Sequence, residues 1–458
     1  LEIPDLPADW AKATALRPGE EKVSFTADSY HEFVDCPTVF APSIKQLHFE
    51  EDGTDFHLHF QGEYGGDEKL DEYIIDMVRA IVKEQGAIFG GFPFSSYHFI
   101  YRLLPFNMRH AVEHSNSASF ALPATVTQSK RQALSGLAGI TAHEFMHAWN
   151  VKRIRPAALW PYDYSQPQYT RLHWFTEGVT DYYADLTLVR SGLIEEDRFW
   201  KSMAGTIQSL ENDYAAQIVS PEAASFNSWL ARTPYEHPDH RISYYTLGVR
   251  VGMLMDAELI RRSKGEQNLD DLFRLLYQTY YAQDRGVPEN GIQQGLEKLT
   301  SDSWQDFFSR YVAGTEPVPY DELLEPFGLT LSLDPATQKG LRQWGITSSD
   351  KLNQGILIRK VHPGSDAFAA GLDVNDLLLE VDGNPALKVD FEKYMKDLKP
   401  GARVPLTIFR GGGLMKLDLT YEQLYRPVRA NLSREERIAK KKENLYLRWL
   451  SSATSTQN

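Results

Sequence analysis

His143-Glu144-Phe145-Met146-His147 is the stretch of sequence that decides the fold, and the apolar residues on both sides of it predict a buried helix. Positions i and i+4 of a helix project from the same face, one turn apart. The imidazoles of His143 and His147 can therefore both reach one Zn²⁺ ion at about 2.0–2.1 Å. Glu144 falls beside them, where it can take a proton from the attacking water. The alternative is a pair of histidines on the surface of a helix.

The third ligand decides between these interpretations, because a catalytic zinc takes three protein ligands and keeps a fourth position open. Glu177 begins the next strong helical pattern, and the loop before it is long enough for an antiparallel return. Asp181, one turn further along, is placed to accept a hydrogen bond from a ligand imidazole. His173 is the alternative third ligand, and Glu177 could instead be an acid that stabilises the start of a helix.

The composition limits the classes of function. The 458 residues contain 48 basic and 62 acidic side chains, a net charge of −14, which argues against nucleic acid as the main partner. The same charge suits a substrate with a positive end, such as the free amine of a peptide, or serves solubility alone. The single cysteine, Cys36, excludes an intramolecular disulfide and a cysteine-based zinc site.

The ends of the chain carry no targeting pattern. The sequence opens on Leu-Glu-Ile-Pro-Asp, without an initiator Met or a signal peptide, so we expect further sequence before residue 1. There is no run of 18 or more apolar residues, so no membrane span is predicted. We expect the cytoplasm rather than the periplasm as the compartment.

The order of strand-like and helix-like segments along the sequence predicts an α+β protein of several domains. Residues 1–65 are β-rich, and residues 66–325 form a mostly helical domain that carries the metal motif, whose first helix opens at Asp67 and ends at Gly86. Residues 326–424 form a small β-rich module.

A charged C-terminal helix is expected over residues 425–458. Ser433 and Glu436 make a capping box for it, and its apolar side carries Ile438, Leu445 and Trp449.

The spacing of these residues resembles a known group of enzymes. His-Glu-x-x-His, followed by Glu177 on the next helix and Asp181 four residues later, is similar to the gluzincin metallopeptidases. The chain resembles more closely the glycyl aminopeptidase family, which couples a thermolysin-like catalytic domain to a C-terminal PDZ domain. In that family further β structure usually precedes the segment that corresponds to Leu6–Trp10, which agrees with sequence missing before residue 1.

The resemblance implies an anchor for the substrate amine. Members of the family carry the pattern Gly-Gly-x-Glu-His on an edge strand beside the metal, and the glutamate of this pattern binds the substrate's N-terminal ammonium. Glu113 matches that glutamate, so the resemblance implies the same role for it. A carboxylate there would select free amines. His110 and Ala111 stand in place of the two glycines and alter the space for the first substrate residue. The alternative is an exposed glutamate on a strand.

The resemblance also implies an oxyanion donor. Tyr245, three residues before Gly248, matches the tyrosine of a Tyr-x-Lys-Gly pattern, with Leu247 in place of the lysine. A phenol aimed at the oxyanion commonly contributes a few kcal/mol of transition-state stabilisation. Tyr244 is the alternative donor, and both rings could instead pack at a helix start.

Residues 355–383 resemble a bacterial PDZ domain, with a Pro-Gly turn, a small-residue helix ending at Gly371 and a following strand. PDZ domains bind extended peptides by strand addition, and a backbone loop receives the terminal carboxylate. The corresponding loop here is Trp344-Gly345-Ile346, which departs from the usual Gly-Leu-Gly-Phe. The alternative is a structural domain packed on the catalytic body.

The sequence thus predicts an aminopeptidase with one zinc ion held by His143, His147 and Glu177. Glu144 acts as general base, Tyr245 as oxyanion donor and Glu113 as amine anchor. Its partners would be peptides with a free N-terminus that begin with a small residue such as Gly or Ala. The alternatives are a zinc endopeptidase and a catalytically silent PDZ-type binding protein.

Overall fold

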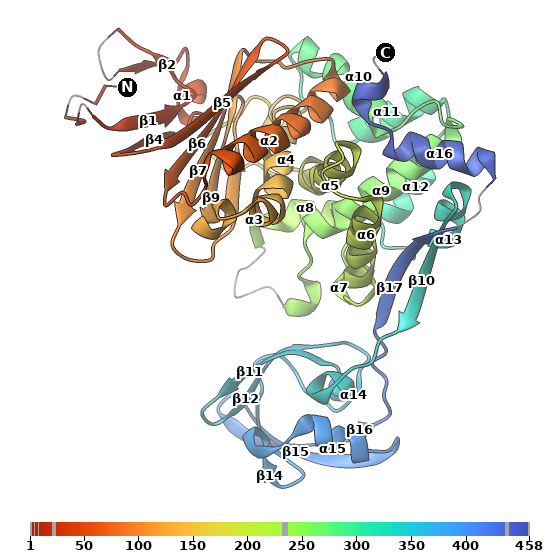
Figure 1. Cartoon of the computed structure of the whole chain (residues 1–458). Coiled ribbons are helices and arrows are strands. Elements are labelled where there is room, and N and C mark those ends of the chain that lie inside the picture. The colour runs from red at the N-terminus through yellow and green to blue at the C-terminus, as the bar shows by residue number, and fades with distance from the viewer. Residues whose placement is uncertain are drawn as a thin grey trace.

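The computed structural model describes residues 2–3, 5–7, 9–20, 24–230, 237–435 and 439–456. A small N-terminal β segment lies beside a large body of one sheet and many helices, and a β-rich module hangs from the body on a two-stranded arm (Figure 1). The α+β multidomain architecture expected from the sequence is therefore confirmed. No helix among the described residues has both the length and the apolar character needed to cross a membrane.

A five-stranded sheet forms one side of the body, in the order β5-β6-β7-β9-β8. Its central pairs, β6–β7 and β7–β9, are parallel, whereas the outer pairs are antiparallel. Strand β8 lies at the edge, where a further strand could add to it. The strands are β5 (Lys45–Glu51), β6 (Thr54–Gly62), β7 (Ser96–Leu104), β8 (His110–Glu113) and β9 (Ser117–Pro123).

Helix α2 (Glu68–Phe89) packs against this sheet. It begins after Asp67, whose carboxylate accepts a backbone hydrogen bond as N-cap. The expected end at Gly86 is wrong, because the helix continues to Phe89 and ends at Gly90 with φ 78°. Gly86 is instead a packing position, since a Cβ there would lie 2.6 Å from the ring of Phe92.

The N-terminal segment is β-rich, as expected. Strand β1 (Ala11–Thr14) pairs with β4 (Thr38–Ala41), and the short helix α1 (Tyr30–Val34) precedes β4. The boundary predicted at residue 65 falls between β6 and α2. The five-stranded sheet contains strands from before and after residue 65, because β6 pairs along its length with β7. The predicted boundary therefore falls within one sheet.

The other half of the body is helical, as expected. The metal-motif helix α4 (Gly139–Met146) contacts α5 (Thr180–Arg190), and the long helix α9 (Tyr244–Arg262) crosses behind them. The surrounding helices are α6 (Glu196–Glu211), α8 (Pro221–Phe226), α10 (Leu269–Thr279), α11 (Gly291–Thr300), α12 (Gln305–Tyr311) and α13 (Tyr320–Leu324).

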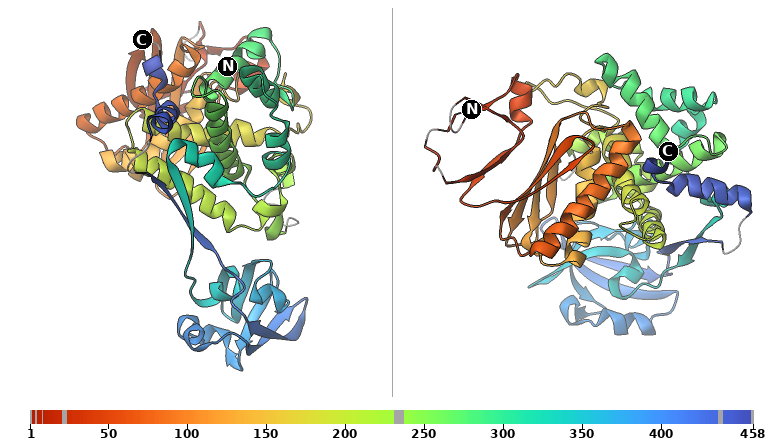
Figure 2. Two further views of the ribbon diagram at one scale, coloured as in Figure 1. Left: turned by 90° about the vertical axis from the view of Figure 1, so that its right-hand side faces the viewer. Right: turned by 45° about the horizontal axis from the view of Figure 1, so that its top comes forward.

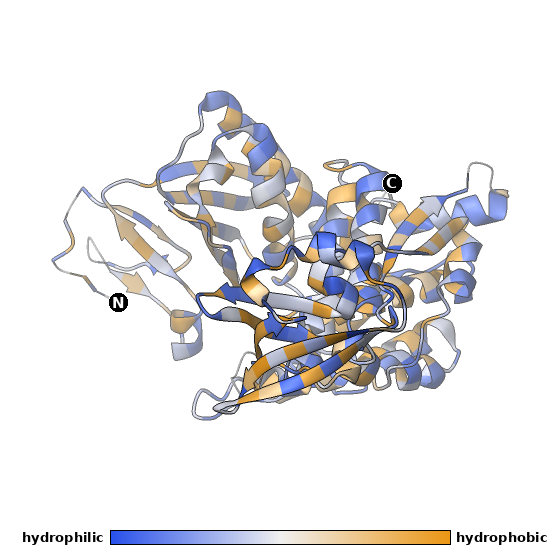
Figure 3. Ribbon diagram, turned by 90° about the horizontal axis from the view of Figure 1, so that it is seen from below, coloured by the Kyte–Doolittle hydropathy of each residue, from blue (hydrophilic) through white to orange (hydrophobic). Residues whose placement is uncertain are grey.

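The C-terminal module has a hydrophobic core of its own. Its sheet has the order β11-β12-β13-β15-β16, and hydrophobic and hydrophilic residues alternate along the strands (Figure 3). This period of two buries one face of β12, β13 and β15 in the core of the module, whereas only Ile346 of β11 is buried there. The elements are β11 (Ile346–Leu352), β12 (Gly355–Val361), α14 (Asp366–Ala369), β13 (Leu377–Val381), α15 (Phe391–Asp397), β15 (Ala402–Arg410) and β16 (Gly413–Tyr421).

An antiparallel ribbon joins the module to the body (Figure 2). Strand β10 (Leu329–Pro335) leads out and β17 (Val428–Arg434) leads back, paired residue for residue. The helix-capping role expected of Ser433 is wrong, because Ser433 lies in β17 opposite Thr330. Glu436 and Ile438, also assigned to that helix, lie outside the described residues.

The C-terminal helix α16 (Lys440–Leu450) returns to the body and buries Leu445 and Trp449, as its apolar side predicts. The Trp449 indole N–H donates to the Tyr182 hydroxyl at 2.6 Å, and its carbonyl accepts from Arg190 at 2.9 Å. Arg190 in turn forms a buried ion pair with Asp270 at 3.0 Å. The last helix thus completes a polar network behind α5.

Replacement of Trp449 tests how much the C-terminal helix stabilises the body. Trp449→Ala is expected to lower the free energy of unfolding by about 3–5 kcal/mol, because it leaves a cavity and takes the indole partner from Tyr182. Urea unfolding followed by circular dichroism measures the loss. Leu447→Ala on the same helix, at a residue 52 % exposed, is the matched control. An equal effect of the two changes would contradict the role of Trp449.

Candidate metal centre and peptidase site

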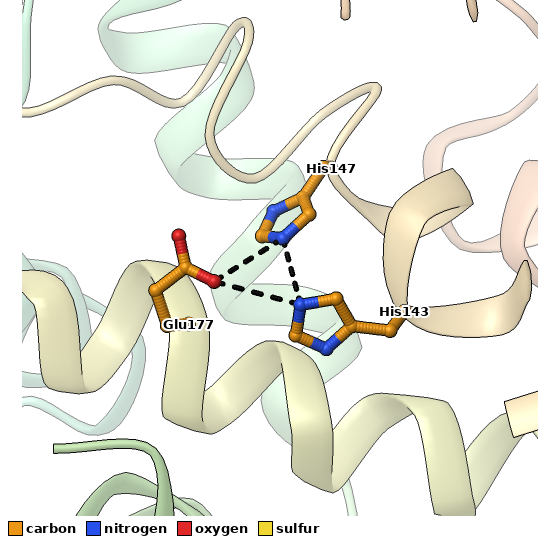
Figure 4. A group of neighbouring side chains, drawn as sticks. All are labelled: His143, His147 and Glu177. Atoms are coloured by element: carbon orange, nitrogen blue, oxygen red, sulfur yellow. Dashed lines mark hydrogen bonds and ion pairs between the residues drawn. The ribbon is translucent and has the colours of Figure 1, made fainter. Parts of the chain in front are cut away.

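Three predicted ligands converge between two helices (Figure 4). His143 comes from α4 and His147 from its C-terminal end, while Glu177 comes from the π-helical turn η4 (Trp174–Val179) that leads into α5. The Glu177 Oε2 atom lies 3.5 Å from His143 Nε2 and 3.3 Å from His147 Nε2, and the two Nε2 atoms are 2.9 Å apart. Such π-helical turns are frequent at functional sites.

These separations fit a tetrahedral zinc ion. Ligand atoms at about 2.0–2.1 Å from a tetrahedral ion stand about 3.3 Å apart, which is close to the three distances observed. Two imidazoles and one carboxylate are also a donor set that catalytic zinc uses. His173 belongs to neither of the two groups of converging ligand atoms found among the described residues, so the geometry favours Glu177 over it as third ligand.

Both imidazoles are oriented so that Nε2 faces the point where the three ligand atoms converge. Asp181 Oδ1 lies 2.7 Å from His143 Nδ1, as the sequence predicted. The Asn150 carbonyl lies 2.7 Å from His147 Nδ1 and accepts its hydrogen bond. With His147 Nδ1 donating to that carbonyl and His143 Nδ1 facing the Asp181 carboxylate, each Nε2 is turned toward the position of a metal.

Asn150 was not predicted from the sequence. Its carbonyl orients His147, while its side-chain amide donates to the Phe175 carbonyl at 3.1 Å and to the Thr180 hydroxyl at 3.0 Å. The residue therefore ties the end of α4 to the turn that carries Glu177. A buried asparagine three residues after the second histidine is the signal that could have indicated it.

The general-base candidate Glu144 lies beside the ligands and is 5 % exposed. Burial raises the pKa of its carboxyl to about 7, and the nearby Glu113 and Glu177 add to this while the two histidines oppose it. Its Oε2 atom is buried without a hydrogen-bond partner among the described residues. A carboxylate of this kind is ready to hold a proton for a reacting group.

Glu113 approaches the same point from β8. One ligand atom each of Glu113, Glu144 and His147 lies within 4.8 Å of the others. The edge strand therefore brings a second carboxylate to the centre, on the side of Glu144 and His147. Of the two residues that depart from the family pattern, His110 is exposed and Ala111 packs against the core.

Tyr245 also lies beside the ligands. Its ring is 6.1 Å from that of His143, and Glu177 is the charged group that acts most strongly on its phenol. Burial and then the charge of Glu177 raise the pKa of this phenol, which keeps it a donor. Leu247 points away into an apolar cluster with Leu210, so its departure from the family's lysine leaves the site unchanged on this side.

Two glycines allow Tyr245 to come this close. A Cβ on Gly248 would lie 2.1 Å from the Trp174 carbonyl oxygen, and a Cβ on Gly178 would lie 2.4 Å from the Gly248 Cα. Both contacts are with backbone, which has little room to move. Helix α9 can therefore touch η4 only where both helices lack side chains.

A buried ion pair fixes the turn that follows Glu113. Asp35 Oδ1 accepts from the Lys152 ammonium at 2.7 Å, and Asp35 Oδ2 accepts from the Ser115 backbone N–H at 2.8 Å. His114 lies 3.3 Å from the same carboxylate. Burial alone would raise the pKa of Asp35, but these partners hold it well below its usual range. The N-terminal segment thus braces the strand that carries Glu113.

Comparison with known proteins agrees with this geometry. Residues 136–251 match the family described as M61 glycyl aminopeptidase, and residues 335–420 match the PDZ domain. This part of the catalytic body is thus similar to the M61 glycyl aminopeptidase family. The resemblance stated from the sequence is thereby confirmed, and the chain is a peptidase that carries a PDZ domain.

Individual proteins resemble different parts of this chain. The crystal structure of an aminopeptidase N family protein from Idiomarina loihiensis has the same fold, with a TM-score of 0.81 and 23% identity over 96% of this chain and 77% of that one. The serine endoprotease DegS of Escherichia coli K12 is 31% identical over 71 residues, 15% of this chain and only 20% of that protein. The match to the crystal structure of an M1 zinc metallopeptidase from Deinococcus radiodurans spans 68% of this chain and 63% of that one, at 14% identity and with a TM-score of 0.39.

The glycine contact can be tested by adding one methyl group. Gly248→Ala is expected to push α9 away from η4 and move Tyr245 off Glu177, lowering kcat at least about tenfold and stability by about 1–3 kcal/mol. Gly205→Ala is the matched control, because it also lies within a helix and its Cβ would meet nothing within 4 Å. Thermal unfolding and peptide turnover measure both. A Gly248→Ala protein as active and stable as the control would show that the contact does not set the site.

Proposed function

We propose that the chain is a zinc-dependent aminopeptidase that hydrolyses the N-terminal peptide bond of peptides, with small first residues such as Gly or Ala preferred. The observation that carries the proposal is Glu113, whose carboxylate lies within 4.8 Å of the general-base candidate and a ligand histidine. An ammonium group bound there would sit one residue from the scissile carbonyl. The family match over residues 136–251 supports the same class of reaction.

The roles of the residues follow from their positions. When bound by His143, His147 and Glu177, zinc supplies Lewis-acid chemistry, lowering the pKa of water and polarising the scissile carbonyl. Glu144 takes the proton of the attacking water and later gives it to the leaving amine. The Tyr245 hydroxyl donates a hydrogen bond to the oxyanion that develops at the carbonyl.

Glu113 makes the enzyme exopeptidic in this proposal. Its charge compensates the substrate ammonium inside a partly closed site, where an unpaired charge would be costly. An internal peptide segment would instead place an uncharged amide against Glu113. Ala111, two residues before Glu113 on the same face of the edge strand, adds a methyl group where the family has glycine, whereas His110 points to the other face and is exposed.

We further propose that the PDZ domain binds extended peptides at the outer edge of β11. This strand ends the sheet of the module and follows the loop Trp344–Ile346. Gly345 there has φ 88°, and a Cβ on it would lie 2.2 Å from the Ser365 side chain, so the loop keeps its shape only with glycine. Strand addition with a carboxylate held by loop N–H groups is the binding mode that this arrangement offers.

Metal removal and Glu144→Gln test the chemistry together. Chelation is expected to abolish hydrolysis of Ala-Gly-amide, and zinc to restore it. Glu144→Gln is expected to lower kcat by about 10³-fold or more, since a general base contributes about 10²–10⁴-fold, while the protein retains one zinc ion by elemental analysis. Turnover near the wild-type rate in either experiment would contradict the mechanism. A wild-type protein that binds peptides through its PDZ domain but never hydrolyses them would support the silent binding protein.

Glu113→Ala distinguishes an aminopeptidase from an endopeptidase. It is expected to raise KM for free-amine peptides by about 10–100-fold, because it removes a hydrogen bond to a charged group. The KM for N-acetylated peptides should not change. Val112→Ala, at an exposed neighbour on the same strand, serves as control. Equal cleavage of free and acetylated peptides by the wild type would instead indicate an endopeptidase.

A further inference from the structure

Strand β16 is an unpaired edge of the sheet in the PDZ module. It spans Gly413–Tyr421 and pairs along its whole length with β15, residue for residue. In the order β11-β12-β13-β15-β16, no described strand lies on its other side. The backbone N–H and C=O groups on that side are therefore a template for a further strand. The peptide-binding mode proposed for the PDZ domain uses β11 and leaves this edge unused.

The hairpin that joins β15 to β16 fixes which residues face the open side. Arg410 pairs with Gly413 across a loop of two glycines, both with positive φ. The pair that closes a two-residue hairpin turns its N–H and C=O groups toward each other. Because this orientation alternates along an antiparallel ladder, the even-numbered residues from Leu414 to Thr420 turn their N–H and C=O groups outward.

Two opposite charges stand on this strand. Lys416 and Asp418 are both exposed, and because they are two residues apart their side chains lie on the same face. Neither of them forms an ion pair within the part of the chain that the structure describes. The strand thus presents a positive and a negative group side by side, both free to meet a partner.

A second copy of the strand, running antiparallel, matches these charges. When the two-fold axis passes through Leu417, Lys416 lies opposite the partner's Asp418, and symmetry repeats the pair. Residues directly opposite in an antiparallel pair share a face, with Cβ atoms about 4.5–5.5 Å apart, and opposite charges there attract. The strand is therefore complementary to itself in this register.

The same charges disfavour the neighbouring registers. An axis through Lys416 places two lysines opposite each other, and an axis through Asp418 places two aspartates opposite each other. An axis between two residues sets outward N–H groups against inward ones, so the ladder does not form. A lysine on an edge strand generally keeps other strands away. Of these registers, only the one centred on Leu417 gives that lysine an opposite charge.

Exposed apolar side chains lie along the same strand. Leu414 is 70 % exposed and Met415 41 % exposed, while Leu417 is half-buried. In the register centred on Leu417, the two copies of this leucine meet on the axis, and Met415 lies opposite the partner's Leu419. Pairing then removes apolar surface from water and satisfies open N–H and C=O groups at the same time.

The contacts that hold the module to the body lie elsewhere in its sheet. Lys360 forms an ion pair with Asp213 at 2.9 Å, and His362 packs on Tyr214. Lys360 belongs to β12, which is three strands away from β16 in the sheet order. A second copy at β16 also leaves the edge of β11 unpaired, so both PDZ domains keep their peptide-binding edge.

We propose that two copies of this chain associate through β16, in an antiparallel pair centred on Leu417 that joins the two PDZ sheets into one. This association does not depend on the peptidase function. The interface is small, in the class below about 1,200 Å² that transient complexes use, so the dimer forms reversibly at about micromolar or higher chain concentrations. Two peptide-binding edges in one particle raise the apparent affinity for a partner that displays two peptides.

Sedimentation velocity of the full chain over a concentration series tests the association. The wild type is expected to pass from monomer to dimer as the concentration rises. Lys416→Asp is expected to raise the dissociation constant at least about tenfold, because both cross-strand attractions become repulsions. The double variant Lys416→Asp/Asp418→Lys is expected to restore the dimer, because it exchanges the charges. Lys399→Asp, at an exposed lysine outside the strand, is the matched control.

A single introduced cysteine tests the register. Leu417→Cys places two thiols on the axis, at a non-hydrogen-bonded pair whose Cα atoms lie about 4.5 Å apart, which a disulfide can span. Mild oxidation is therefore expected to link the dimer. Leu414→Cys is the matched control, because its two copies lie about 20 Å apart along the paired strands. The natural Cys36 is buried, so the wild type is expected to stay unlinked.

The outcomes separate the parts of the proposal. A wild type that stays monomeric up to about 200 µM chain overturns the association. A dimer that Lys416→Asp leaves intact overturns the assignment to β16. A double variant that is folded by circular dichroism but stays monomeric overturns the charge pairing. Linking of Leu414→Cys as readily as Leu417→Cys overturns the register, whereas linking of Leu417→Cys alone supports it.

Discussion

The close approach of η4 and α9 at Gly178 and Gly248 is the contact on which the geometry of the site depends. Because neither helix carries a side chain there, their backbones meet, and the first turn of α9 reaches the residue just before Gly178. That residue is Glu177, so one packing contact determines both a ligand and its phenolic neighbour. The π-helical turn is the local deformation that lets the chain carry Glu177 to this contact.

Buried charge organises the rest of the site. The carboxylates of Glu113, Glu144 and Glu177 lie close together, and bringing them together without a cation would be costly. In the function proposed above, a metal ion and a substrate ammonium would supply the positive charges that balance them, while the two ligand imidazoles are neutral. This requirement explains why the site is a place for cations, and why Asp35 and Lys152, nearby but already paired, form a neutral brace instead.

The sequence predicted the parts of the site that local periodicity controls. The helical repeat places His143 and His147 on one face of a helix, and Glu177 and Asp181 have the same spacing of four residues. Asn150 was not predicted because the backbone carbonyl that orients His147 could come from any residue type, and the side-chain amide that bonds to Phe175 and Thr180 has partners 25 and 30 residues away. Asp35 lies 80 residues from Ser115, its hydrogen-bond partner, and no local pattern connects such distant positions. Ser433 misled for the opposite reason: a local capping pattern was present, but pairing of β17 with the distant β10 overrode it.

The ribbon of β10 and β17 makes the PDZ domain an insertion rather than an appendage. Pro335 and Val428 stand opposite each other at its far end, and the Ala336 N–H bonds to the Pro427 carbonyl just beyond. The chain therefore leaves and re-enters the body as the two sides of a hairpin. A short turn joining these two residues would excise the module and still deliver α16 to its seat behind α5. A different recognition domain joined at the same two residues would keep α16 in place and would replace two contacts of the present module with the body, the Lys360–Asp213 ion pair and the packing of His362 on Tyr214.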